Sequence, residues 1–121
     1  MIERGNFREA LGIMGFTAAG KVYTYEGESW RISADFAAGT LSYPEAVRGR
    51  EHNTSFTAPE NFVVFECVHR LLVKGYRPED IHLEKAWPLG RTQKSGRADI
   101  CVYKKDSEEV LMIIECKTAG R

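Results

Sequence analysis

The 121-residue chain has little of what marks the more specialised classes of protein. It has only three cysteines, widely spaced and without a CxxC pair, which argues against a zinc site and favours their role as small core residues. Neither charge dominates, because 17 basic and 17 acidic residues give a formal net charge of zero. Bulk charge therefore does not attract polyanions, and any contact with nucleic acid must come from local clustering of basic residues.

Long hydrophobic runs are also missing. The longest are Phe62–Phe65 and Val110–Ile114, far shorter than the roughly 20 residues that span a bilayer. Residues 1–10 mix acids and bases and contain no apolar signal-peptide core. Hydrophobic residues make up 43% of the chain and charged residues 28%, as in ordinary globular proteins. We therefore expect a cytoplasmic protein without a membrane partner, folded as a single domain over residues 1–121.

The first part of the chain, residues 1–56, has the pattern of a helix followed by a hairpin. Apolar side chains recur at helical spacing before Gly15, and two aromatic and β-branched runs flank a Glu-Gly-Glu turn. The predicted elements are a helix over residues 6–14, strands over 21–25, 29–36 and 40–43, and a loop over 44–57.

The second part, residues 57–121, predicts a helix followed by three strands. Thr57 is a suitable N-cap, and Glu60 three residues later completes a capping box for a helix over 59–74. The predicted strands cover 81–87, 98–103 and 110–117, with a glycine-rich basic loop over 88–96. The apolar run of the last strand predicts burial on both faces.

These elements predict an α/β fold with a mixed central sheet and flanking helices. Only five residues follow Cys116, where a further helix would be expected to cover the sheet. We therefore expect the chain to be a fragment of a longer protein, cut short after its third core strand.

Three polar residues stand out by their position on the last two predicted strands. Asp99 begins one strand, while Glu115 and Lys117 end the next, with Cα atoms about 6.6 Å apart on one face. If these strands are neighbours, the Asp99 and Glu115 carboxylates meet at one end of the sheet. Such a pair suits Mg²⁺, which polarises a phosphate and activates water, and Lys117 could hold or deprotonate that water.

Ordinary structural roles compete with this interpretation. Glu115 and Lys117 could form a salt bridge at a sheet edge, which stabilises little when exposed. Asp99 could be a turn residue that bonds its own local backbone. The pattern of residues alone leaves both alternatives open.

Two segments resemble the PD-(D/E)xK nuclease core: Gly96-Arg97-Ala98-Asp99-Ile100, and Leu111-Met112-Ile113-Ile114-Glu115-Cys116-Lys117. More narrowly, they resemble the N-terminal nuclease domain of type I restriction-enzyme restriction subunits. Restriction proteins that fuse a nuclease to an N6-adenine methyltransferase are similar. A third segment fits that domain's first helix: it runs from Pro59-Glu60-Asn61-Phe62 to Leu71-Leu72-Val73-Lys74-Gly75-Tyr76. The resemblance therefore covers about residues 57–119.

The resemblance implies a restriction-endonuclease-like core and a Mg²⁺-dependent endonuclease. Glu60 matches the family's first acidic residue better than Glu66 does, although a capping role for Glu60 competes. Asp99 matches the metal-binding aspartate. Glu115 and Lys117 match the paired acid and lysine. The backbone carbonyl of Cys116 is a further candidate metal ligand.

DNA is the partner that this resemblance implies, together with the remaining domains or subunits of a restriction–modification complex. Arg91, Lys94 and Arg97 lie in the basic loop that precedes Asp99. Such a loop is suited to gripping backbone phosphates without reading bases. The alternative function is a non-catalytic docking or DNA-holding module with a nuclease-like fold.

Overall fold

The structure is a computed structural model, which describes residue 2 and residues 4–88 and 95–118. The described residues form two α-helices and seven strands. They are α1 (Phe7–Ile13), β1 (Thr17–Ala19), β2 (Val22–Glu26), β3 (Arg31–Asp35), β4 (Thr40–Ser42), α2 (Glu60–Val73), β5 (Ile81–Pro88), β6 (Ser95–Tyr103) and β7 (Val110–Ile114). Short 3₁₀ turns cover Arg4–Asn6, Arg50–Asn53 and Pro78–Asp80.

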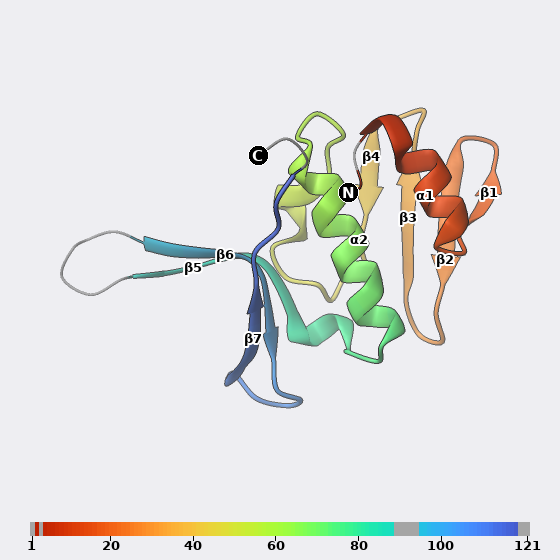
Figure 1. The fold of residues 1–121 in the computed structure, drawn as a ribbon. Helices are drawn as coiled ribbons and strands as arrows, with labels where there is room; N and C mark the ends of the chain where they lie inside the picture. The colour runs from red at the N-terminus through yellow and green to blue at the C-terminus, as the bar shows by residue number, and fades with distance from the viewer. Residues whose placement is uncertain (1, 3, 89–94, 119–121) are drawn as a thin grey trace.

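The strands form two sheets, of order β1-β2-β3-β4 and β5-β6-β7, and α2 lies between them (Figure 1). The predicted α/β class is confirmed. The predicted mixed central sheet is wrong. The strands form two sheets and not one, and every pairing between the named strands is antiparallel. The reason is that short hairpin connections allow only antiparallel neighbours, whereas parallel neighbours need a long crossover.

One parallel contact joins the two parts of the described chain. Arg48 forms a parallel bridge with His82. Its amide donates to the carbonyl of Ile81 at 3.0 Å, and its carbonyl accepts from the amide of Leu83 at 2.7 Å. Gly49 follows with a φ of 74°, and a Cβ there would overlap the Leu83 carbonyl. This position therefore requires glycine. The close approach holds the β5 backbone in place at Leu83, the residue before Glu84.

A single hydrophobic core contains residues from both helices and both sheets. Phe7 of α1 lies at its centre, with its ring centroid 4.7 Å from that of Phe62 on α2. Both side chains are buried, and each such burial contributes about 1.5–3 kcal/mol. Residues 1–56 and 57–121 thus pack together, and the beginning of α2 is held firmly in place.

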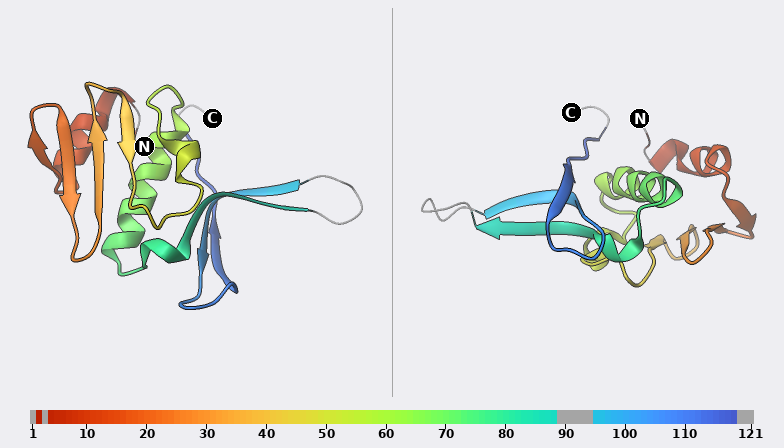
Figure 2. Two further views of the ribbon diagram at one scale, coloured as in Figure 1. Left: turned by 180° about the vertical axis from the view of Figure 1, so that it is seen from behind. Right: turned by 90° about the horizontal axis from the view of Figure 1, so that it is seen from below.

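The hairpin and helix predicted in residues 1–43 are confirmed as β2, β3 and α1. The short strand β1 was not expected, and the predicted loop over 44–57 contains a 3₁₀ turn. Figure 2 shows the outer part of the β5–β6 hairpin extending away from the other elements. Neither described α-helix has the length and apolar content to cross a lipid bilayer.

The prediction for the last strand is wrong in two respects. β7 ends at Ile114 and not at Lys117, and it is not buried on both faces, since Leu111 and Ile113 are 47% and 53% exposed. The physical reason is that β7 pairs only with β6 in the described structure and packs one face, through Met112 and Ile114, against the core. An apolar run alone does not reveal such a position.

The predicted capping box is also wrong. α2 begins at Glu60 with Pro59 at the N-cap, and no side chain caps the helix. Thr57 instead pairs with Ser55, whose hydroxyl accepts from the Thr57 amide at 3.0 Å and lies 2.7 Å from the Thr57 hydroxyl. This local turn takes up the polar groups that a capping box would have used.

Candidate functional site

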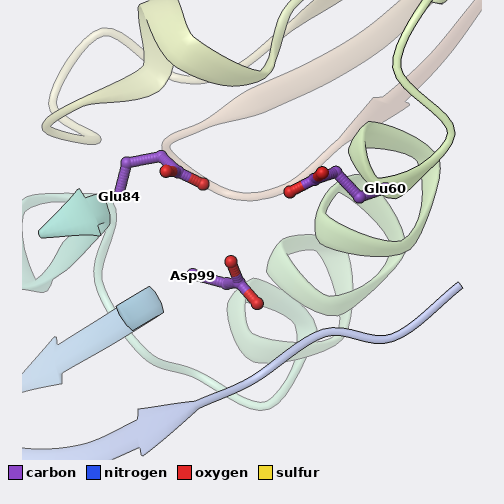
Figure 3. A group of neighbouring side chains, drawn as sticks. All are labelled: Glu60, Glu84 and Asp99. Carbon is purple, nitrogen blue, oxygen red and sulfur yellow. The ribbon is translucent and has the colours of Figure 1, made fainter. Parts of the chain in front are cut away.

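Three carboxylates from three different elements meet beside the first turn of α2. Glu60 lies on α2, Glu84 on β5 and Asp99 on β6, and one oxygen of each lies within 4.8 Å of the others. Figure 3 shows Glu60 and Glu84 pointing toward each other from opposite sides, with Asp99 below and between them in this view. We refer to Glu60, Glu84 and Asp99 as the acidic triad.

Glu60 is positioned by the residue that follows it. Asn61 is buried, accepts a hydrogen bond from the Asn53 side chain at 2.8 Å and donates to the Ser55 carbonyl at 2.8 Å. These bonds fix the start of α2. The amide of Thr57 donates to Ser55 and not to Glu60, so the competing capping role does not account for Glu60, whose carboxylate lies in the triad.

Asp99 connects β6 to the segment that follows β7. Its Oδ2 accepts a hydrogen bond from the amide of Cys116 at 2.7 Å. The bond crosses between segments 17 residues apart, so the local-turn alternative for Asp99 is wrong. A charge-assisted bond of this kind is stronger than one between neutral groups. It orients the carboxylate and holds the Cys116 backbone against the triad.

Glu84 was not found from the sequence. It lies on β5 between the pairs Leu83–Ile100 and Lys85–Ala98 of the β5–β6 ladder, the same interval that contains Asp99. Its φ of 56° places it in the left-handed region, which costs a non-glycine residue roughly 1–2 kcal/mol. In the sequence it occupies an ordinary polar position of an alternating strand, so only the positive φ and the register reveal it.

Glu84 also forms an ion pair with a basic side chain. Arg97 Nη1 lies 3.3 Å from Glu84 Oε1, with 65% of the Arg97 side chain and 11% of the Glu84 side chain exposed. Arg97 was predicted to contact DNA, and the structure places it beside the carboxylates. Arg91 and Lys94, the other two predicted DNA contacts, lie outside the described residues.

Glu115 and Lys117 lie just past the end of β7 and are exposed. They are not part of the acidic triad, and the strand alternation expected to place them on one face ends at Ile114. Cys116 between them contacts Asp99 through its amide. A cation shared by Asp99 and Glu115 therefore stays a prediction.

A second contact holds this segment against α2. The neighbouring Cys67 thiol, together with burial, raises the pKa of the half-buried Cys116 thiol above its ordinary value. Cys116 is thus anchored through its side chain and through its amide, as expected for a half-buried cysteine used in packing.

The donor set of the triad fits a hard divalent cation. Mg²⁺ prefers carboxylate oxygens and keeps several waters, and the triad offers one carboxylate from each of three elements. Like charges this close repel one another, and a cation between them would relieve that repulsion. Arg97 offsets part of it on Glu84 alone.

The fold and the site together define an α/β domain with an acidic centre between a helix and a hairpin. Residues 59–120 match the family model described as type I restriction enzyme R protein N terminus. The match covers just over half of the chain, so the chain belongs to this family of restriction-enzyme N-terminal domains. It includes the acidic triad, Glu115 and Lys117. No curated protein and no solved structure was found to match the chain.

Proposed function

We propose that this domain is a Mg²⁺-dependent endonuclease that hydrolyses DNA phosphodiester bonds and has the PD-(D/E)xK type of site. The observation that carries the proposal is the meeting of Glu60 and Asp99, two residues far apart in sequence, within one group of carboxylates. Membership of a restriction-enzyme family supports DNA as the substrate.

The cation would be held by Glu60, Glu84 and Asp99, with the Cys116 carbonyl and Glu115 as further oxygen donors. A bound Mg²⁺ would polarise the scissile phosphate and make its bound water more acidic. Asp99 is suited to this role because its Oδ2 is already oriented by the Cys116 amide. Little side-chain ordering would then be needed on binding.

Lys117 would act on the water and on the phosphate. Its ammonium carries three donors, enough to hold an attacking water and to stabilise negative charge that develops on the phosphorane. Lys117 is exposed, so a DNA strand has access to it. Arg91, Lys94 and Arg97 would hold the neighbouring phosphates, with Arg97 exchanging its bond to Glu84 for one to DNA.

The second candidate is a non-catalytic docking or DNA-holding module of a larger restriction or methyltransferase protein. The observation in its favour is that Glu115 and Lys117 lie outside the acidic triad and are exposed. Both candidates have the same partners, which are DNA and the other domains or subunits of a restriction–modification complex. Both also have the same cytoplasmic location.

Nicking of supercoiled plasmid separates the two candidates. We expect the protein to nick the plasmid with Mg²⁺ and not after chelation. Asp99→Asn should lower the nicking rate by more than the roughly 10–100-fold that follows from altering a residue that merely supports a metal ligand. The asparagine side chain keeps an oxygen that can accept the hydrogen bond from the Cys116 amide. We therefore expect this variant to fold normally. Glu28→Gln removes an exposed carboxylate in the β2–β3 turn and is the matched control. Cutting that survives chelation, or an undiminished Asp99→Asn variant, would contradict the endonuclease proposal.

A further inference from the structure

A second charged site lies between α1 and the chain that leads into α2. A pocket of about 690 Å³ is lined by Arg4, Gly5, Arg8, Glu9, Lys21, Phe36 and Phe56. We refer to these residues as the basic pocket. It holds three cationic side chains and one carboxylate, in a chain whose formal net charge is zero. The excess positive charge is therefore local.

Two phenylalanine rings orient the arginines of the basic pocket. The Arg8 guanidinium carbon lies 4.6 Å from the ring centroid of Phe36, and that of Arg4 lies 6.0 Å from the ring centroid of Phe56. The two rings meet edge to face at 5.2 Å. A guanidinium stacked on a ring keeps the N–H groups of its edge available for an anion.

Arg8 and Lys21 of the basic pocket differ from three other arginines, which have a carboxylate partner. Arg31, Arg70 and Arg77 form ion pairs at 2.7–2.9 Å. Within the described part of the chain, no carboxylate forms an ion pair with Arg8 or Lys21. Their charges are consequently available to a ligand.

We propose that the basic pocket binds the phosphodiester backbone of DNA. This inference rests on the proposed function for the identity of the polyanion. Guanidinium groups match the geometry of phosphate oxygens, and the Phe36 and Phe56 faces already carry the Arg8 and Arg4 guanidinium groups, so the contact is with phosphate and not with bases.

The position of the pocket relates it to the acidic triad. Phe56 precedes Glu60 by four residues along the chain. Figure 1 shows α1 and α2 both beginning toward the same edge of the structure. A DNA backbone that crosses this edge contacts the basic pocket while one of its phosphodiesters lies at the acidic triad. The pocket then contributes affinity and orientation without sequence reading.

Fluorescence anisotropy with a labelled duplex oligonucleotide in EDTA tests this inference without cleavage. We expect the double variant Arg8→Gln/Lys21→Gln to bind about ten-fold more weakly than the unaltered protein. Its slope of log K against log salt should be smaller in magnitude by roughly 2, since each phosphate contact contributes about 0.9. Lys74→Gln/Lys105→Gln is the matched control, because it removes the same charge from two exposed lysines elsewhere. The control should keep both the affinity and the slope.

Three results would overturn the inference: unchanged binding by Arg8→Gln/Lys21→Gln, an equal loss in both double variants, or no DNA binding by the unaltered protein. Should the double variant unfold, Lys21→Gln alone is used, with Lys74→Gln as its control. Failure of the nuclease proposal looks different, since it would leave this binding defect intact while plasmid nicking is absent. Asp99→Asn, with its basic pocket unaltered, should lose cutting and keep the salt slope.

Discussion

Glu84 and Asp99 lie between the β5–β6 pairs Leu83–Ile100 and Lys85–Ala98, with their carboxylates in one group. Like charges held this close repel each other, and the left-handed backbone of Glu84 adds a further cost. Arg97 offsets the charge of Glu84 only from the exposed side. We therefore expect the pair to lower the stability of the fold without metal, and a bound cation to recover that stability.

We predict that Glu84→Gln weakens metal binding without weakening the fold. Removing one of two neighbouring charges relieves repulsion, so the melting temperature without metal should be unchanged or higher. The increase in melting temperature on adding Mg²⁺ should shrink, because ligand stabilisation follows the affinity of the folded state. Thermal unfolding with and without Mg²⁺ measures both, and Glu28→Gln should behave like the unaltered protein. An unchanged Mg²⁺ response in Glu84→Gln would remove Glu84 from the site.

Gly49→Ala should destabilise the fold strongly. The added Cβ overlaps the carbonyl of Leu83 and needs a positive φ as well. The expected loss exceeds about 2 kcal/mol of unfolding free energy, since the left-handed conformation alone costs roughly 1–2 kcal/mol. Gly20→Ala is the matched control, with a φ of 65° and no heavy atom within 4 Å of the new Cβ.

Urea unfolding compares the two glycine variants. Gly20→Ala should show only the conformational cost, and Gly49→Ala that cost plus the overlap. Equal losses of unfolding free energy in the two variants would mean that the backbone at residues 48–49 can shift at little cost. Gly49 would then not determine the position of β5.

His69 makes stability depend on pH. It is buried on α2, its ring lies 4.5 Å from that of Tyr25 and 5.0 Å from that of Phe16, and neither ring nitrogen has a hydrogen-bond partner among the described residues. Burial, and secondarily the charge of Arg70, lowers the pKa of His69 below its ordinary value. The folded state therefore prefers the neutral imidazole.

As the pH falls through about 6.5, the unfolded chain takes up the His69 proton before the folded chain does. Stability should thus be full above about pH 6.5 and should fall on acidification until the lowered folded pKa is reached. His69→Phe should reduce this dependence. His82 leaves a remainder of the same sign, because burial lowers its pKa as well. Urea unfolding between pH 5 and 8 measures the slope, and the exposed His52→Gln is the control. A slope unaltered by His69→Phe would contradict this assignment.

Local patterns predicted the long elements well and the contacts between them poorly. The helix expected over residues 59–74 is α2 at Glu60–Val73, because its apolar spacing and Gly75 are local signals. The pattern singles out Asp99 because it begins a predicted apolar strand, but β6 starts at Ser95, so Asp99 lies in the interior of the strand. Glu84 could not be found in this way, since its meeting with Asp99 depends on the register of two strands. The exposure of Leu111 likewise depends on what lies beside β7.

The last prediction concerns Lys117, whose role in the proposed reaction is electrostatic. The side chain is exposed and lies beyond the end of β7, so Lys117→Ala should leave the melting temperature and its Mg²⁺-induced increase unchanged. Plasmid nicking should fall by about 10²–10³-fold, the usual cost of losing one group that stabilises transition-state charge. Lys105→Ala, an exposed lysine in the turn before β7, should cut normally. Normal cutting by Lys117→Ala would contradict its role. If the protein binds DNA and Mg²⁺ but does not nick the plasmid, the docking module is favoured. In that case the acidic triad is a metal site, but it does not carry out the reaction proposed for it.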